Sequence, residues 1–192
     1  MRLNFYIMAN KKFYNPKINI QKFGDWYITK NLLIQLEPAI KKGSIAGQKR
    51  AAQELKRIVR RNIRENGGKI GWPPVSEKYA KYKRKKGFDP ENLYVMTGLY
   101  YRSIKIYRDG NNISIGLKRY TRHQGRTNNN LTLIKIANIL ENGSAVRNIK
   151  ARPLWKPSYK QFGGSKRLKG FILWHVRNEI KKRTGVTPKL TY

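Results

Sequence analysis

The chain has 192 residues, with 43 Lys and Arg against 10 Asp and Glu and no cysteine, and its formal net charge is +33. This length suits one domain with a core and an appended arm, while the self-repulsion of so many like charges calls for an anionic partner. Without cysteine there are no disulfides or thiolate metal sites, which favours a reducing compartment, and no apolar run reaches the length of a signal-peptide core or a membrane-spanning helix.

The first 42 residues scatter aromatic side chains among Lys and Asn, and Pro16 and Pro38 are expected to interrupt any long helix. This composition predicts an arm over residues 1–42 that becomes ordered on a partner, for example on a neighbouring subunit. Short strands lying on the core are the alternative.

A helix is predicted from about residue 45 to 66, with Ser44 as its N-cap and Gly67-Gly68 at its end. Three- and four-residue spacing assigns one face to the core: Ala51, Ala52, Leu55, Ile58, Val59, Asn62 and Ile63. The other face is cationic: Lys49, Arg50, Lys56, Arg57, Arg60, Arg61 and Arg64. This second face is either an ordinary solvated face or a surface for a polyanion.

Beyond the glycines, Pro73 and Pro74 predict an extended approach to a short helix that Ser76 caps and that runs through Tyr82. A basic run follows, which we interpret as a loop: Lys83, Arg84, Lys85 and Lys86. With the nearby tyrosines this run suits phosphate gripping and base stacking, and a solvated loop is the alternative.

The centre of the chain is a predicted β-hairpin over about 104–117. Alternating β-branched and aromatic residues form two short runs, joined by Asp109-Gly110-Asn111-Asn112, a sequence that tolerates positive φ. Thr97 is predicted to cap a short turn that leads into the first strand.

The remaining segments complete a predicted α+β domain over 43–185, with a short tail over 186–192. Residues 119–130 form a basic polar loop that contains Arg119, Arg122 and Arg126. A middle helix over about 131–141 ends at Asn142-Gly143, residues 151–157 are extended, and a C-terminal helix covers about 165–183. We expect the helices to pack on the hairpin sheet. The core-directed residues predicted for the C-terminal helix are Leu168, Phe171, Ile172, Trp174, His175, Val176 and Ile180.

The acidic and histidine side chains form no recognisable catalytic set. Asp89 and Glu91 are the only near pair and flank a proline in a loop, while His123 and His175 have no acidic neighbour that suggests a dyad. Gly163-Gly164-Ser165-Lys166 lacks the spacing of a phosphate-binding loop. We therefore expect no enzymatic activity, no metal and no cofactor.

The order of five short motifs resembles the neck and tail-completion proteins, or head-tail connectors, of tailed double-stranded DNA bacteriophages. After a long amphipathic helix come the motifs Gly71-Trp72-Pro73-Pro74-Val75-Ser76, Leu93-Tyr94-Val95-Met96-Thr97-Gly98-Leu99-Tyr100-Tyr101-Arg102-Ser103-Ile104, a hairpin that ends near Gly116, Ile136-Ala137-Asn138-Ile139-Leu140-Glu141-Asn142-Gly143, and Ala151-Arg152-Pro153-Leu154-Trp155. They span about residues 43–183. The aromatic arm, the 119–130 insertion and the high charge depart from the family pattern.

The resemblance implies a non-enzymatic virion protein, assembled in the cytoplasm of the host bacterium. It would form a sixfold or twelvefold ring between portal and tail proteins and surround packaged double-stranded DNA without reading its sequence. A monomeric, sequence-independent nucleic-acid binder is the alternative, and the charge also suits acidic neighbouring proteins. The predicted DNA or partner contacts are Lys56, Arg57, Arg60, Arg61, Arg64, Lys83, Arg84, Lys85, Lys86, Arg119, Arg122 and Arg126.

Overall fold

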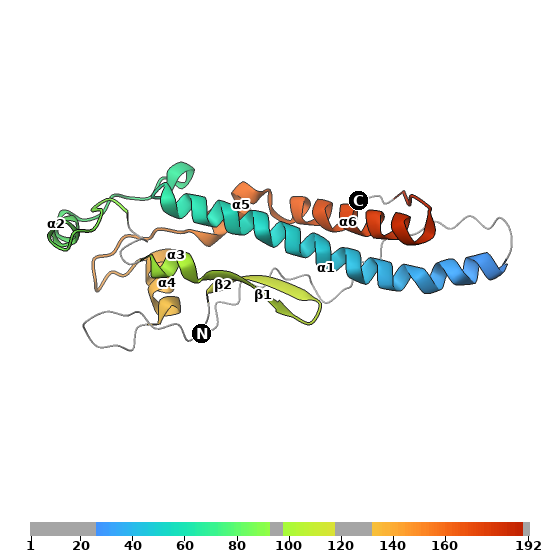
Figure 1. The fold of residues 1–192 in the computed structure, drawn as a ribbon. Coiled ribbons are helices and arrows are strands. Elements are labelled where there is room, and N and C mark those ends of the chain that lie inside the picture. The colour runs from blue at the N-terminus through green and yellow to red at the C-terminus, as the bar shows by residue number, and fades with distance from the viewer. Residues whose placement is uncertain (1–25, 93–97, 118–131, 190–192) are drawn as a thin grey trace. The chain divides into compact units, whose positions relative to one another are not determined.

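A computed structural model describes residues 26–92, 98–117 and 132–189 of the chain (Figure 1). The described elements are α1 (Trp26–Arg64), a 3₁₀ turn η1 (Gly68–Ile70), α2 (Glu77–Lys85), α3 (Leu99–Ser103), β1 (Ile104–Asp109), β2 (Asn112–Leu117), α4 (Leu133–Asn142), α5 (Trp155–Phe162) and α6 (Gly164–Thr184). The predicted α+β class is confirmed, and β1 and β2 pair as the predicted antiparallel hairpin.

The described residues divide into two compact units. Unit 1 comprises residues 54–92, 98–107, 115–117 and 132–162, and unit 2 comprises residues 26–53, 108–114 and 163–189. Helix α1 and the hairpin contribute residues to both units. Both units contain residues of the range 43–185, for which the sequence predicts a single domain, and the single domain stays a prediction.

In unit 2, α1 and α6 pack in antiparallel orientation through a line of small residues on α1. Ala39 is fully buried and clusters with Val176 and Ile180 of α6. The Cα of Gly43 lies so near α6 that a Cβ there would stand 2.5 Å from the Cα of Val176, and a Cβ on Gly47 would stand 2.6 Å from the Cα of Ile172. This four-residue spacing lets the two backbones approach closely.

The C-terminal part of α1, which contributes Ala51 and Ala52 to unit 2 and the residues from Leu55 onward to unit 1, supplies the core face that periodicity predicts. All seven predicted core residues of α1 are buried: Ala51, Ala52, Leu55, Ile58, Val59, Asn62 and Ile63. Asn62 finds partners on α5, because its Nδ2 donates to Ser158 Oγ at 2.9 Å and to Gln161 Oε1 at 3.0 Å. The polar residue at a core position is thus satisfied by hydrogen bonds.

The predicted start of the long helix at about residue 45 is wrong, because α1 begins at Trp26 and Ser44 lies inside it. Pro38 lies within the helix rather than interrupting it. A helical proline removes one hydrogen-bond donor and crowds the carbonyl four residues earlier. The helix nevertheless continues past Pro38, and the next residue, Ala39, is buried against α6. Residues 26–42 are thus helical, while residues 1–25 of the predicted arm lie outside the described part.

Two further expectations are corrected near the C-terminus. The segment expected to be extended over 151–157 instead leads into α5, whose third residue is Pro157. Proline is tolerated there, because the N–H groups of a first helical turn have no intrahelical partner. Trp174, predicted to face the core, is 60% exposed, whereas Leu173 is buried in its place.

The residues predicted to end or precede the helices lie close to the observed helix ends. Asn66 and Gly67 adopt positive φ of 47° and 92° where α1 ends, and Gly143 after α4 has a φ of 76°. Ser76 precedes α2 as predicted, although its side chain makes no capping hydrogen bond. Thr97 lies outside the described residues, and Gly98, with a φ of 68°, immediately precedes α3.

Candidate functional site

The motif segments of unit 1 meet at one junction, which we call the motif junction and define as Trp72–Pro74, Tyr100, Glu141–Gly143 and Arg152–Trp155. The indole Nε1 of Trp72 donates to the carbonyl oxygen of Pro153 at 2.8 Å. Segments that stand about eighty residues apart in the sequence are therefore joined directly by a partly buried hydrogen bond.

Arg152 forms the centre of the motif junction. Its side chain is buried, and its guanidinium donates to three backbone carbonyls: Pro73 at 3.0 Å, Pro74 at 2.8 Å and Lys150 at 3.2 Å. Its own backbone N–H donates to the carbonyl of Leu140 at 2.6 Å. The planar fork of arginine suits several acceptors at once, so this residue ties the Pro-Pro segment to the segment after α4.

Glu141 caps the start of α5 from the end of α4. The backbone N–H of Leu154 donates to Glu141 Oε2 at 2.8 Å, and that of Trp155 donates to Oε1 at 3.3 Å. These are donors that a helix leaves unsatisfied at its N-terminus. Burial raises the pKa of Glu141 above its usual range, although these backbone donors act in the opposite direction.

Tyr100 and Gly143 complete the motif junction. The Trp155 side chain hydrogen-bonds to the Tyr100 hydroxyl, and burial raises the pKa of that hydroxyl. A Cβ on Gly143 would stand 2.8 Å from the carbonyl oxygen of Ile149 and 2.9 Å from the backbone N of Ala151. The close backbone approach and the positive φ together require glycine at this position.

The C-terminal part of α1 presents the predicted cationic face, which we define as Lys56, Arg57, Arg60, Arg61 and Arg64. Arg57, Arg61 and Arg64 are exposed, and Lys56 and Arg60 are half-buried. Among the described residues, none of the five makes an ion pair, whereas Lys42 pairs with Glu179 and Lys81 pairs with Glu77. Their charge is therefore left for solvent ions or an anionic partner.

Neighbouring positive charges crowd this face. Burial, followed by the charges of Arg60 and Lys105, lowers the pKa of Lys56. The Arg60 guanidinium also lies 4.9 Å from the ring centre of Tyr101, and its Nη2 donates to the carbonyl of Ile104 at 3.3 Å. Arg60 is thus held by contacts with α3 and β1. Lys105 of β1 adds a further positive charge to this cluster, and the sequence alone did not predict its place there.

The second predicted cluster lies at the end of α2, and one of its residues is in the wrong environment. Lys83 is fully buried and its Nζ donates to the carbonyl oxygen of Asn92, so it is not a surface contact. The other three, Arg84, Lys85 and Lys86, are exposed. Helix α2 extends through Lys85, so most of the basic run is helical rather than a loop.

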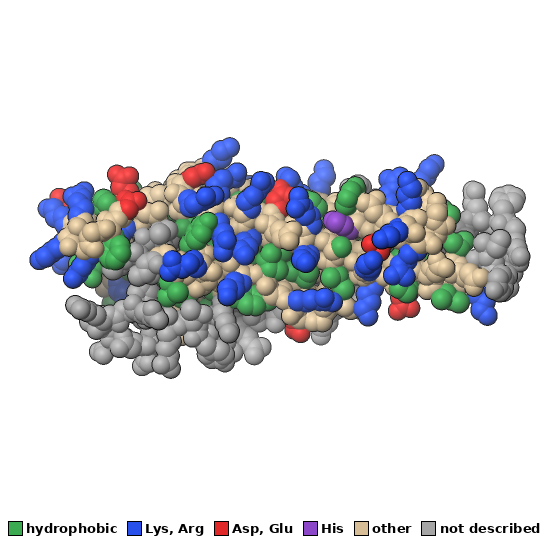
Figure 2. Space-filling view, viewed as in Figure 1, with side chains coloured by type: hydrophobic (Ala, Val, Ile, Leu, Met, Phe, Trp, Pro, Cys, Tyr) green, Lys and Arg blue, Asp and Glu red, His purple; other side chains and the backbone are tan. Residues whose placement is uncertain are grey.

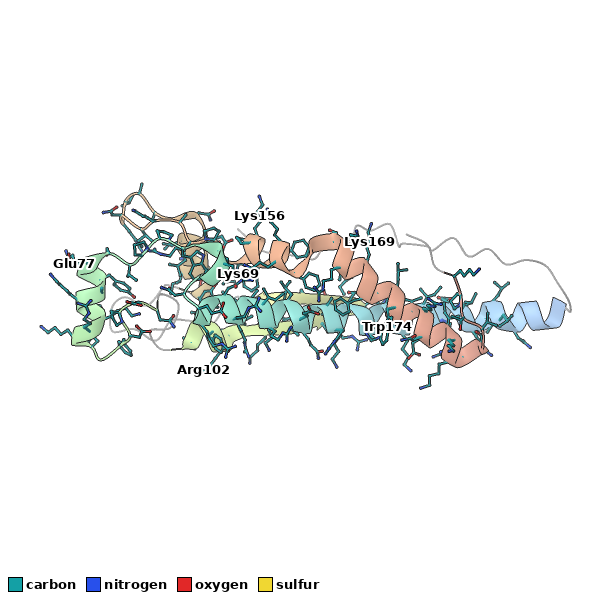
Figure 3. All side chains as sticks on the ribbon, turned by 90° about the horizontal axis from the view of Figure 1, so that it is seen from above. Lys69, Glu77, Arg102, Lys156, Lys169 and Trp174 are labelled. Atoms are coloured by element: carbon teal, nitrogen blue, oxygen red, sulfur yellow. The ribbon has the colours of Figure 1, made fainter. Side chains whose placement is uncertain are left out.

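The two cationic clusters belong to different elements of unit 1. In Figures 1 and 3, α2 lies beyond the C-terminal end of α1, at the end of the chain segment that follows η1. Figure 2 shows Lys and Arg side chains spread over the visible face with few Asp and Glu among them. The third predicted cluster, Arg119, Arg122 and Arg126, lies outside the described residues.

The described residues hold no group of three or more His, Cys, Asp and Glu side chains placed to bind a metal ion. Asp89 and Glu91 form a local turn, in which the backbone N–H of Glu91 donates to Asp89 Oδ1 at 2.9 Å. His175 is half-buried and packs edge-on against Trp174, and His123 lies outside the described part. No described helix is both long and apolar enough to cross a membrane.

Comparison with known proteins identifies no relative: no protein-family model, no curated protein and no solved structure matches the chain.

Proposed function

We propose that this chain is a structural subunit of a ring in the neck, or head-tail connector, of a tailed bacteriophage. The motif junction is the observation that carries the proposal. The residues that give the sequence its resemblance to connector proteins are Trp72, Glu141 and Arg152 with their neighbours, and they hydrogen-bond to one another. Their meeting at one place supports the proposal, because it gives the separate motifs a shared structural role.

In the proposed virion, the cationic face of α1 serves the DNA conduit. Arg57, Arg61 and Arg64 are exposed and make no ion pair among the described residues. Contacts from such side chains to phosphates hold DNA without reading its sequence. A ring of six or twelve copies between portal and tail proteins repeats this face around the packaged double-stranded DNA.

Size measurement on the purified full chain tests the ring. Mass photometry over a concentration series, followed by negative-stain electron microscopy, is expected to give closed rings of six or twelve subunits, alone or with the portal and tail proteins of the same virion. The chain is also expected in purified virions. A chain that stays monomeric with those partners and never enters particles contradicts the proposal.

The second candidate function is a monomeric, sequence-independent nucleic-acid binder, and the unpaired cationic face of α1 favours it. Titration of a 30-base-pair duplex at two salt concentrations separates the two functions. Tight binding by a monomer, with a steep loss of affinity as salt rises, supports the binder. Tight binding that appears only with the assembled ring supports the connector.

A further inference from the structure

Helix α6 carries a large exposed aromatic side chain on the side away from its core. Trp174 is 60% exposed, although the adjacent Leu173 is buried in unit 2. Figure 3 labels Trp174 on the middle of α6. Tryptophan at a protein surface is strongly enriched at the centres of protein interfaces, where its burial supplies much of the binding energy.

Trp174 belongs to a regular stripe. The residues that share this side of α6 follow one another at alternating steps of four and three, namely Arg167, Phe171, Trp174, Asn178 and Lys181. This spacing places the five residues on one side of the helix, with Phe171 and Trp174 as adjacent aromatic members and polar residues on either end. The buried residues Leu168, Val176 and Ile180 lie on the opposite side.

The two aromatic residues of the stripe are held by their neighbours. Trp174 packs edge-on against His175, with 4.7 Å between the ring centres and 88° between the ring planes. The Arg167 guanidinium lies 5.9 Å from the ring centre of Phe171. Side chains that are already restrained lose less conformational entropy when a partner binds.

The charge around the stripe has one sign. Arg177 and Lys182 flank it and are exposed. The only acidic residue of α6 is Glu179, which pairs with Lys42 of α1 at 3.2 Å. Cationic side chains around an exposed aromatic pair favour a partner that carries acidic side chains.

Two other occupants fit this surface less well. A second copy of the chain carries 43 basic and 10 acidic residues and would place like charges together. Duplex DNA keeps its bases stacked, so phosphate contacts from Arg177 and Lys182 would leave the indole of Trp174 without a role.

We propose that this stripe of α6 is a docking site for an amphipathic helix with acidic flanks on another protein. Apolar side chains of that helix pack on Phe171 and Trp174, while its carboxylates face Arg177 and Lys182. The inference concerns α6 alone and goes beyond the ring proposal.

A synthetic helix tests this site on the full chain. The probe is a 21-residue heptad peptide with Leu at positions a and d and Glu at positions e and g, and a peptide of the same composition in scrambled order controls for bulk charge. Calorimetric titration at 150 mM salt is expected to show preference for the heptad peptide. Trp174→Ala should weaken that binding at least tenfold, and the exposed double variant Arg177→Ala/Lys182→Ala should weaken it comparably.

The matched control is Arg57→Ala/Arg61→Ala, which removes the same charge from α1 and should change peptide affinity less than twofold. Circular dichroism checks that each variant keeps its helices, and the Arg177/Lys182 variant decides the case if Trp174→Ala unfolds. Equal weakening by the α1 control and the α6 variants overturns the proposal. So does loss of duplex binding instead of peptide binding in Trp174→Ala, or loss of self-association in that variant. The assay uses no ring, so failure of the ring proposal leaves its outcome unaffected.

Discussion

At the residue scale, the buried side chain of Arg152 joins two segments of unit 1. Its guanidinium donates to the carbonyls of Pro73 and Pro74 in one segment and of Lys150 in its own. Arg152→Ala removes the buried guanidinium and its three hydrogen bonds, each worth about 1 kcal/mol, so we expect a loss of about 3 kcal/mol in the free energy of unfolding. Arg152→Lys should recover only part of this, because an ammonium lacks the planar fork.

Urea unfolding measures the Arg152 effect as a shift of the midpoint at constant m-value. The control is Arg147→Ala in the exposed turn after α4, which should change stability by less than about 0.5 kcal/mol. Equal midpoints for the two alanine variants would show that the Arg152 hydrogen bonds contribute little to stability.

Glu141 gives the motif junction a dependence on pH. Its pKa is raised in the folded chain, mainly by burial, so the folded state holds this proton more tightly than the unfolded state, whose pKa is about 4.3. The resulting stabilisation is fully present below pH 4.3 and is lost as pH rises through the higher folded pKa. The stability of wild type relative to Glu141→Gln should therefore fall over this range.

The measurement for Glu141 is urea unfolding of both proteins at several pH values from 4 to 7. Because Glu141→Gln keeps the size of the side chain and one acceptor oxygen, the difference between the two proteins isolates the titration of this carboxyl. A difference that stays constant with pH contradicts the prediction.

At the scale of elements, the contact between α1 and α6 depends on two glycines. Alanine favours a helix over glycine by about 1 kcal/mol, but a Cβ on Gly43 would meet the backbone Cα of Val176 at 2.5 Å. Backbone atoms yield only if the helices separate, so Gly43→Ala and Gly47→Ala should each destabilise the chain by about 1–3 kcal/mol.

Thermal and urea unfolding of the two glycine variants, with Gln53→Ala as the control on the exposed side of α1, measure this effect. The control should be neutral or slightly stabilising, since it adds helix propensity without a clash. A Gly43→Ala protein as stable as wild type would mean that the two helices separate at this point at little cost in free energy.

Sequence periodicity predicted the elements with one clear apolar face and failed where composition was ambiguous. Seven core positions of α1 are buried as predicted, because its charged and apolar arcs are cleanly separated. In α6 four apolar or aromatic residues follow one another from Phe171 to Trp174, so the pattern does not reveal that Trp174 faces outward. Pro38 marks a helix break by propensity, yet α1 continues through it.

The candidate site was predictable only in part, for a related reason. Residue type identified the exposed arginines of α1, because a charge surplus on one helical arc is visible in sequence. Lysine is rarely fully buried, so nothing local indicated that Lys83 lies buried beside the carbonyl of Asn92. The motif junction depends on hydrogen bonds between segments far apart in sequence, which no local pattern encodes.

At the scale of the whole molecule, a net charge of +33 should make salt stabilising. The Debye length falls from about 30 Å at 0.01 M to about 8 Å at 0.15 M, so added salt weakens repulsion throughout the chain. The ion pairs Lys42–Glu179 and Lys81–Glu77 have exposed lysines, so their screening by salt should cost little stability. The melting temperature should therefore rise by a few degrees between 10 and 150 mM NaCl, as calorimetry would show; a fall would mean that attraction outweighs repulsion.

The same charge predicts how DNA binding divides between surfaces. Arg57 and Arg61 are exposed and unpaired among the described residues, one helical turn apart on α1. If each contacts one phosphate, Arg57→Ala/Arg61→Ala should reduce the slope of log affinity against log salt by about 2, since each phosphate contact contributes roughly 0.9. Fluorescence anisotropy with a labelled duplex over a salt series measures this slope.

The matched variant Arg177→Ala/Lys182→Ala on α6 should leave the slope unchanged, because that face suits an acidic helix rather than a duplex. Equal slopes in both variants would mean that DNA contacts are spread over the whole cationic surface rather than concentrated on α1.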